Sequence, residues 1–149
     1  MKYLFLLLGI IGFLSCEKDE TPVQSLPDLE PEIIIDWGVI LNSTEVFVVR
    51  LHNNGSITTL PSIFYIQKMD PVATCIFPTQ SGITVTEQGT RWKVQIDDPI
   101  FAGGFIDVIA IIEPQLAGSA SINASIVSGT GGGETPTTNN INVYKFTVQ

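Results

Sequence analysis

The sequence predicts an all-β fold, an antiparallel β-sandwich of seven or eight short strands. From Glu32 onward, apolar and polar residues alternate with a period of two, in segments that Asn, Gly and Pro residues interrupt. No stretch keeps a helical period of apolar residues over three turns. Short alternating segments between turn residues are typical of two packed antiparallel sheets. A β-barrel is the main structural alternative.

The first residues of the chain predict export and lipid attachment. Lys2 precedes an unbroken apolar run from Tyr3 to Leu14. This run is shorter than the roughly 20 residues of a membrane span but suits a signal peptide. The segment Phe13-Leu14-Ser15-Cys16 then resembles a lipobox, in which a signal peptidase cuts before a cysteine that carries lipid. We expect residues 1–15 to be a lipoprotein signal peptide and Cys16 to carry a covalent lipid such as palmitate. An ordinary secretory signal is the alternative.

The residues that follow Cys16 indicate where the protein is delivered. Lys18, Asp19 and Glu20 resemble the export signal of Bacteroidetes surface lipoproteins, a lysine followed by two acids. This resemblance implies an outer-membrane lipoprotein that faces the cell exterior, with the periplasmic face as the alternative. Residues 16–27 carry charges, two prolines and almost no apolar periodicity, which predicts a flexible acidic tether.

Residues 28–149 form a single predicted domain, whose strands can be placed along the chain. The expected strands are Glu32–Val39, Glu45–His52, Ser62–Lys68, Ile83–Thr86, Arg91–Ile96, Phe105–Ile112, Ser119–Ile126 and Ile141–Val148. No strand is placed in the stretch Met69–Gln80, and the sequence leaves the connection between the two sheets open there. The Gly-rich run Ser128–Glu134 is expected to be a flexible hairpin tip, because no Gly-Lys-Ser/Thr motif of a phosphate-binding loop follows it.

Alternation also predicts which side chains face the core. In the strand at 45–52, three apolar side chains share one side: Phe47, Val49 and Leu51. In the strand at 91–96, three others do so: Trp92, Val94 and Ile96. The strand at 105–112 is apolar on both faces apart from Asp107. We therefore expect it to be a central strand that is covered on both sides, with Asp107 near its edge.

Composition narrows the class of partner. The chain has 7 basic and 15 acidic residues, a formal net charge of −8. Removal of residues 1–15 takes away only Lys2, which leaves 6 basic against 15 acidic residues, or −9. An acidic protein repels the phosphates of a nucleic acid, so we expect no nucleic-acid partner. Cys75 is the one cysteine besides Cys16, which excludes a disulfide framework within the chain, and we expect it to pack as a small hydrophobic residue.

Two parts of the domain resemble known bacterial surface modules. Pro27-Asp28-Leu29 and the later stretch Val48–Ser56 (VVRLHNNGS) resemble the start of the cell-adhesion-related domain found in bacteria. Four later stretches resemble the end of the bacterial conserved-repeat Ig-like domain: Ala102-Gly103-Gly104, Ala117-Gly118, Ile122–Val127 and Asn139-Asn140. Both families have immunoglobulin-like folds. The resemblance implies an antiparallel immunoglobulin-like β-sandwich and a surface module that spaces, displays or binds rather than catalyses.

Residues with catalytic or metal-binding chemistry are sparse. His52 is the single histidine and is expected on the surface, because a catalytic triad needs three groups that converge in a pocket. A pocket that joins His52 to at least two carboxylates would be the sign of a small hydrolase or a metal-dependent enzyme. Asp97 and Asp98 are weak candidates for metal ligands, since no Asp-x-Asp-x-Asp series accompanies them. We expect no enzyme, no metal and no cofactor beyond the covalent lipid.

Aromatic residues supply the remaining candidates for ligand contact. Trp37 lies near the end of a predicted strand, and Tyr65 lies on a strand that the pattern cannot orient. Either ring is a candidate for stacking on a sugar. The sequence as a whole predicts a non-enzymatic membrane-anchored surface lipoprotein that acts as an adhesion, display or assembly module through a protein partner. The alternative is a glycan-binding accessory lipoprotein of an outer-membrane uptake system.

Overall fold

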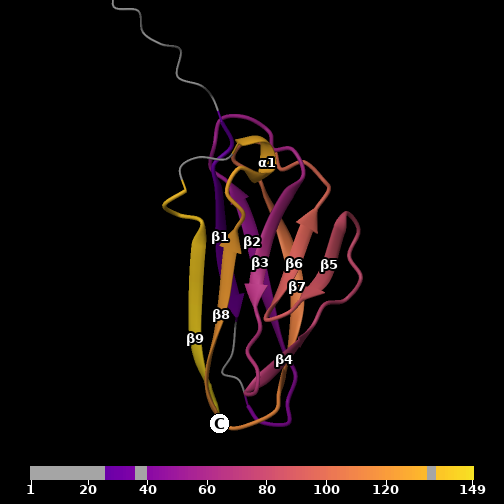
Figure 1. Ribbon diagram of the computed structural model, residues 1–149, viewed down its shortest axis with the longest axis vertical. Coiled ribbons are helices and arrows are strands. Elements are labelled where there is room, and N and C mark those ends of the chain that lie inside the picture. The colour runs from indigo at the N-terminus through magenta and orange to yellow at the C-terminus, as the bar shows by residue number, and fades with distance from the viewer. Residues whose placement is uncertain (1–25, 36–39, 134–136) are drawn as a thin grey trace, which may run out of the picture.

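Two antiparallel sheets pack face to face in the domain (Figure 1). The computed structural model describes residues 26–35, 40–133 and 137–149. One sheet has the strand order β1-β2-β7-β4, and its strands are β1 (Leu29–Ile35), β2 (Glu45–Asn53), β7 (Phe105–Pro114) and β4 (Ala73–Ile76). The other has the order β5-β6-β3-β8-β9, and its strands are β5 (Ile83–Gln88), β6 (Arg91–Ile96), β3 (Ser62–Gln67), β8 (Gly118–Ile126) and β9 (Ile141–Val148). The predicted antiparallel sandwich is confirmed, with nine strands in the described part of the chain.

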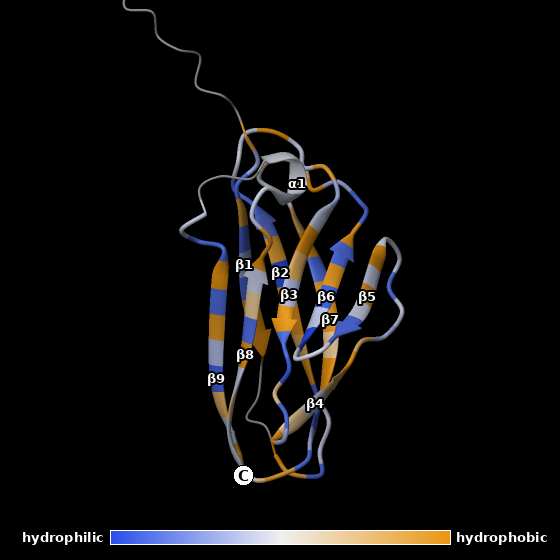
Figure 2. Ribbon diagram, in the orientation of Figure 1, coloured by the Kyte–Doolittle hydropathy of each residue, from blue (hydrophilic) through white to orange (hydrophobic). Residues whose placement is uncertain are grey.

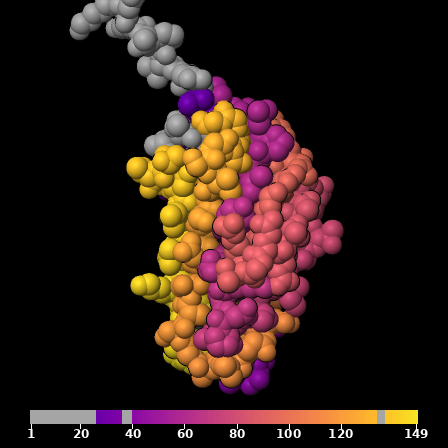
Figure 3. Space-filling view, in the orientation of Figure 1, coloured from indigo at the N-terminus to yellow at the C-terminus, as the bar shows by residue number. Residues whose placement is uncertain are grey.

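The five-stranded sheet faces the viewer in Figure 1, and Figure 3 shows its outer surface. The first described residues enter at the upper end, beside the short helix α1 (Thr130–Gly133), and the C-terminus lies at the lower end. Within the described residues, no helix is long and apolar enough to cross a bilayer.

The core lies between the two sheets and follows the predicted alternation. Phe47, Val49 and Leu51 of β2 are fully buried, as are Phe64 and Ile66 of β3. Figure 2 shows this alternation as apolar and polar bands along the strands. Each fully buried side chain of this kind contributes about 1.5–3 kcal/mol of transfer free energy.

Strand β4 was not predicted from the sequence. It occupies Ala73–Ile76, inside the stretch Met69–Gln80 in which no strand was placed, and pairs with β7 from Ala73 opposite Pro114 to Ile76 opposite Ile111. The segment Ala73–Ile76 (ATCI) gives no strict alternation, because Cys75 and Ile76 are both apolar. The chain therefore crosses to the four-stranded sheet at β4 and returns to the five-stranded sheet at β5.

The prediction that β7 is covered on both sides is wrong. Val108, Ala110 and Ile112 are fully buried, whereas Phe105 is 52% exposed and Ile109 is 40% exposed. β7 is central within its sheet, but the domain has two layers and the outer face of each sheet is open to water. Asp107 accordingly lies in the middle of this outer face rather than at an edge, opposite Arg50 of β2.

The Gly-rich run is not a loose hairpin tip over its described residues. Thr130 is buried, and its Oγ1 accepts a hydrogen bond of 2.7 Å from the backbone N–H of Ile63. Gly131 has φ of 65°, and a Cβ at this position would lie 3.0 Å from Cδ1 of Leu29. Glycine is required there because the backbone is left-handed and the neighbouring side chain is close. The helix α1 thus closes the upper end of the core.

Asn53 joins the start of the domain to its loops. Its amide donates to the carbonyl oxygens of Ile57 at 2.7 Å and Ile100 at 2.9 Å. Its Oδ1 accepts from the backbone N–H groups of Asp28 at 3.3 Å and Gly55 at 3.1 Å. The side chain is fully buried, so all these bonds replace water. The turn Asn53-Asn54-Gly55 therefore fixes the place where the chain enters the domain.

Candidate functional site

Charged and aromatic side chains gather on the outer face of the four-stranded sheet. Since Phe47, Val49 and Leu51 point inward, the intervening residues of β2 point outward. The strand register then aligns two rows across β1, β2 and β7, which we call the charged rows: Glu30, His52 and Phe105 in one, and Glu32, Arg50 and Asp107 in the other. Residues from three separate parts of the chain thus form one surface.

Arg50 is at the centre of the charged rows. Its Nε and Nη2 donate to the two carboxylate oxygens of Asp107 at 2.7 and 2.9 Å. Its guanidinium carbon also lies 4.0 Å from the centroid of the Phe105 ring. The hydrogen bond to Asp107 is the largest influence and raises the pKa of Arg50, with the charges of Asp107 and Glu32 adding to it and desolvation opposing it. Arg50 is a fixed positive charge beside an exposed aromatic ring.

His52 lies in a depression of about 350 Å³. Its Nε2 is 2.8 Å from Oε2 of Glu32, and Nδ2 of Asn54 donates to Glu30 at 2.6 Å. The depression therefore joins the histidine to two carboxylates, the arrangement that would be the sign of an enzyme. Both carboxylates already accept hydrogen bonds. The described residues that line the depression include no serine, threonine or cysteine that could act as a nucleophile: Glu30, Pro31, Glu32, His52, Asn54 and Asn142.

Apolar side chains continue the same outer face beyond the charged rows. The register aligns them in two further rows, which we call the apolar rows: Ile34, Val48 and Ile109 in one, and Val46, Ile111 and Ile76 in the other. Val46 is 57% exposed, and Ile109 and Ile76 are also exposed. A contiguous apolar area beside arginine and an aromatic ring is typical of protein-binding surfaces.

Several residues that the sequence singled out lie elsewhere. Cys16, Lys18, Asp19, Glu20 and Trp37 are outside the described residues. Tyr65 is on the outer face of the five-stranded sheet, and the guanidinium carbon of Arg91 lies 3.6 Å from the centroid of its ring. A cation therefore already occupies one face of this ring.

Asp97 and Asp98 do not converge on a common site. Oδ1 of Asp97 accepts a hydrogen bond of 2.7 Å from Nε2 of Gln95. The Asp98 carboxylate is directed to Gly82, where an added Cβ would lie 2.3 Å from Oδ2. Among the described residues, no group of three or more His, Cys, Asp or Glu side chains is placed to hold a metal ion.

Cys75 is partly buried on β4, consistent with its predicted packing role. Burial, with a smaller effect from the charge of Asp70, raises the pKa of its thiol to about 12. The thiol is therefore protonated and poorly nucleophilic at neutral pH.

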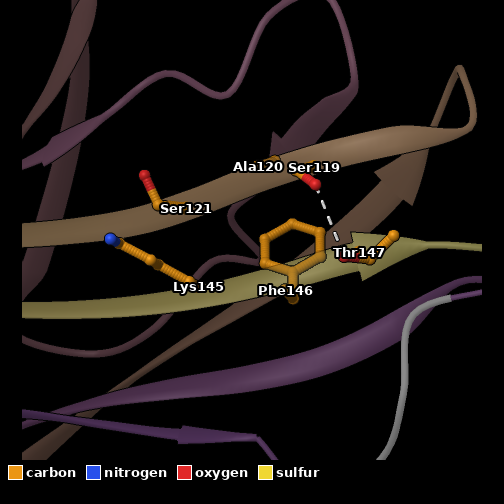
Figure 4. A pocket seen from close by; sticks show the side chains of 6 residues that line it. All are labelled: Ser119, Ala120, Ser121, Lys145, Phe146 and Thr147. Atoms are coloured by element: carbon orange, nitrogen blue, oxygen red, sulfur yellow. Dashed lines mark hydrogen bonds between the residues drawn. The ribbon is translucent and has the colours of Figure 1, made fainter.

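A second depression of about 350 Å³ lies over β8 and β9 (Figure 4). Six residues line it: Ser119, Ala120, Ser121, Lys145, Phe146 and Thr147. The hydroxyl groups of Ser119 and Thr147 are 3.5 Å apart, and Lys145 is the register partner of Ser121. The depression offers hydroxyl groups and one ammonium group to a polar ligand.

The sequence did not reveal the outer face of the four-stranded sheet as a site. Period two placed Arg50 and His52 on the outward side of their strand, which is a usable signal. The partners of Arg50 come from β1 and β7, and Asp107 is 57 residues away in the chain. Arg50 and Asp107 are neighbours because β2 pairs with β7, and the sequence does not specify this strand order.

Comparison with solved structures identifies the fold. A crystal structure of a CARDB domain from Pyrococcus furiosus, in complex with di-metal ions, is 18% identical with a TM-score of 0.59 and covers 83% of this chain and 89% of that one. The solution structure of that domain is 20% identical, with a TM-score of 0.57, and covers 83% and 96%. A cohesin module from a Clostridium perfringens family 33 glycoside hydrolase is 11% identical, with a TM-score of 0.59, and covers 84% and 98%.

No family model matches the chain, and no curated protein matches it. At these identities, the likeness to solved structures concerns the fold. The CARDB domain is the cell-adhesion-related domain that the sequence resembles. The described domain is therefore an immunoglobulin-like β-sandwich similar to that domain, as the sequence predicted.

Proposed function

We propose that this protein is a cell-surface lipoprotein whose domain binds a protein partner through the outer face of the four-stranded sheet. Cys16 carries the lipid, residues 16–27 are the tether, and the sandwich is the adhesion, display or assembly module. The observation that carries the proposal is that the charged rows and the apolar rows lie next to each other on one open sheet face. The protein acts by binding rather than by catalysis.

The composition of this face supports a protein partner. Protein interfaces are enriched in aromatic residues and arginine, and their hot spots tend to be such side chains surrounded by apolar contacts. Phe105 and Arg50 are in contact, and the exposed Val46 and Ile109 lie in the neighbouring apolar rows. Because Arg50 is already paired with Asp107, a partner can cover it without leaving an unpaired buried charge.

The N-terminal sequence motifs and the similarity of the fold to solved structures also support the proposed function. The lipobox-like segment before Cys16 and the acids after Lys18 support a surface address. The similarity of the fold to a CARDB domain and to a cohesin module supports a binding module rather than a catalytic domain. The outer membrane is then a partner through the lipid, and a protein is the partner of the domain.

Photo-crosslinking on intact cells tests the protein partner. The full chain carries a photoreactive residue at position 48, within the apolar rows. We expect one cross-linked protein, and we expect the product to disappear when Val46→Glu is added, since a buried unpaired carboxylate is costly. A photoreactive residue at Thr86, which is exposed on the other sheet, is the matched control and should give no product. Equal products at both positions, or a product that survives Val46→Glu, would overturn the docking face.

Two measurements test the anchor independently. Mass spectrometry of the N-terminal peptide should find Cys16 acylated, and Cys16→Ala should release the protein from the membrane fraction. Protease added to intact cells should remove the domain. A domain that resists protease until the outer membrane is opened would place it on the periplasmic face instead.

The depression over β8 and β9 favours a second candidate function, glycan binding. Its hydroxyl groups and Lys145 could hydrogen-bond to sugar hydroxyls. Titration calorimetry of the full chain against soluble glycans should give heat that Lys145→Gln reduces. Lys93→Gln makes the same change of charge elsewhere on this sheet and should have no effect. A glycan panel without heat at millimolar concentration would reject this function.

A further inference from the structure

Three loops meet at the end of the sandwich where the chain enters the domain. We call residues 55–61, 99–104 and 127–133 the apex, which includes α1 and lies at the upper end of Figure 1. Backbone hydrogen bonds join the loops, from Thr59 to Ile100 at 3.0 Å and from Leu60 to Gly131 at 2.8 Å. The apex is therefore one connected surface rather than three independent loops.

Large apolar side chains project from the apex into solvent. Phe101 is 70% exposed and Leu60 is 64% exposed, and Ile57 is also exposed. Figure 2 shows apolar segments in these loops. Residues of this size rarely stand together in water without a partner surface.

The apex carries no charge. Its three segments, GSITTLP, PIFAGG and VSGTGGG, contain no Asp, Glu, Lys or Arg, although 15% of the chain is charged. Three described acids adjoin these segments, Asp97 and Asp98 before Pro99 and Asp28 beside Gly55, while Glu134, which follows Gly133, lies outside the described residues. Asp97 accepts from Gln95, the Asp98 carboxylate is directed to Gly82, and Oδ1 of Asp28 accepts from Asn139 at 2.8 Å. The loop tips thus present an uncharged, apolar surface.

The backbone beside Phe101 is anchored, and Leu60 lies against a neighbouring loop. Ile100 lies between Pro99 and Phe101, and its N–H donates to Oγ1 of Thr59 at 2.9 Å. Ile100 is itself buried, so the next residue, Phe101, is directed outward. A Cβ on Gly132 would lie 3.4 Å from Cγ of Leu60, which places Leu60 against the backbone of α1.

The place where the chain joins the domain indicates what covers the apex. The backbone O of Leu26 and N of Asp28 lie 2.5 and 2.6 Å from the Cβ position of Gly55, so the chain enters the domain at the apex itself. Nine residues, 17–25, separate Leu26 from Cys16. A relaxed coil of that length spans on the order of 15 to 20 Å. A lipid on Cys16 would hold the apex within reach of the bilayer surface.

We infer that the apex rests on the lipid bilayer, with Phe101, Leu60 and Ile57 in the interfacial region. This inference rests on the proposed lipid at Cys16. Uncharged loops with apolar tips can enter the boundary between headgroups and acyl chains without burying a charge. A domain docked in this way stands with its long axis away from the membrane. The outer face of the four-stranded sheet is then open sideways to a partner.

Fluorescence quenching by brominated lipids tests the inference. The full lipidated chain with Phe101→Trp is incorporated into phosphatidylcholine vesicles whose acyl chains carry bromine near the headgroup. Leu116→Trp is the matched control, because Leu116 is also exposed but lies in the β7–β8 turn at the opposite end, beside the C-terminal residues of β9. Trp37 and Trp92 are common to both variants and cancel in the comparison.

We expect bromolipid to remove about half or more of the added fluorescence in Phe101→Trp, as for a side chain 5–10 Å into the interface, and little in Leu116→Trp. Leu60→Trp should behave like Phe101→Trp. Equal quenching at positions 101 and 116 on a chain whose acylation mass spectrometry confirms would overturn docking while leaving the anchor intact. A blue-shifted, unquenched tryptophan at position 101 would place it against protein, such as a second copy of this chain, and would also overturn docking on the bilayer. A chain without lipid at Cys16 would overturn the anchor and this inference with it.

Discussion

Arg50 and Asp107 form a two-point ion pair across the centre of the four-stranded sheet, at 2.7 and 2.9 Å. The pair lies on the open face, where solvent screens its charges and limits its contribution to stability. Its geometry instead fixes the Arg50 guanidinium over the ring of Phe105. The ion pair therefore positions the Arg50 side chain on the proposed docking face.

Replacement of Asp107 should affect binding more than folding. Asp107→Asn removes the carboxylate that holds Arg50, so the guanidinium becomes free to leave Phe105. We expect the photo-crosslinked product to fall sharply while the thermal unfolding midpoint changes little. Glu113→Gln makes the same change of charge on β7 outside the charged rows and should leave both quantities unchanged. A large drop in the unfolding midpoint would show instead that the pair is structural.

Asn53 should be the most sensitive asparagine of the domain. Asn53→Ala leaves the carbonyls of Ile57 and Ile100 without their donor in a buried site. We expect the free energy of unfolding in urea to fall by about 2–3 kcal/mol. Asn54→Ala is the matched control, since Asn54 is exposed and makes a solvent-exposed hydrogen bond to Glu30. The two variants should differ clearly, and equal losses would contradict the role of Asn53 as the buried link.

Replacing a glycine with a left-handed backbone can cost stability through backbone strain and through a clash of the added Cβ. A comparison of Gly131→Ala with Gly89→Ala distinguishes these two contributions. Gly89 has φ of 59° and open space at the Cβ position, so Gly89→Ala should cost about 1–2 kcal/mol from backbone conformation alone. Gly131 has φ of 65°, and its Cβ position is 3.0 Å from Leu29 and 3.1 Å from Ser62. Gly131→Ala should therefore destabilise the domain more than Gly89→Ala. Urea unfolding of both variants measures the difference, and equal values would mean that the core adjusts around α1.

The sequence was sufficient for those parts of the fold that depend on local pattern. β9 runs from Ile141 to Val148 as predicted, because the alternation there is long and the flanking turn is clear. The inward residues of β2 were also predicted. β1 begins at Leu29, three residues before its predicted start, since Pro31 masks the alternation although it fits an edge strand.

Other features depend on contacts between distant segments and could not be predicted. β4 has four residues and forms because β7 offers it an edge to pair with. The open outer face of β7 follows from the number of layers, which an apolar sequence such as FIDVIAII does not specify. Likewise, a single strand shows that Arg50 points outward, but strand order decides that it meets Asp107.

The raised pKa of the Cys75 thiol predicts that the folded protein loses stability at alkaline pH. Burial raises the pKa of its thiol from 9.0 to about 12 in the folded protein, so between these values the unfolded chain gives up a proton that the folded chain keeps. The folded state is therefore favoured in full below pH 9.0 and loses this contribution as the pH rises towards about 12.

The measurement compares the wild type with Cys75→Ala, because lysine and tyrosine side chains also titrate in this range and cancel in the difference. The unfolding free energy of the wild type should fall relative to that of Cys75→Ala as the pH rises from 9.0 to about 12. At pH 8 the shift lowers the thiolate fraction about a thousandfold, so iodoacetamide should modify Cys75 only after urea unfolds the chain. Rapid modification of the folded protein would mean that the β4 edge opens and exposes the thiol.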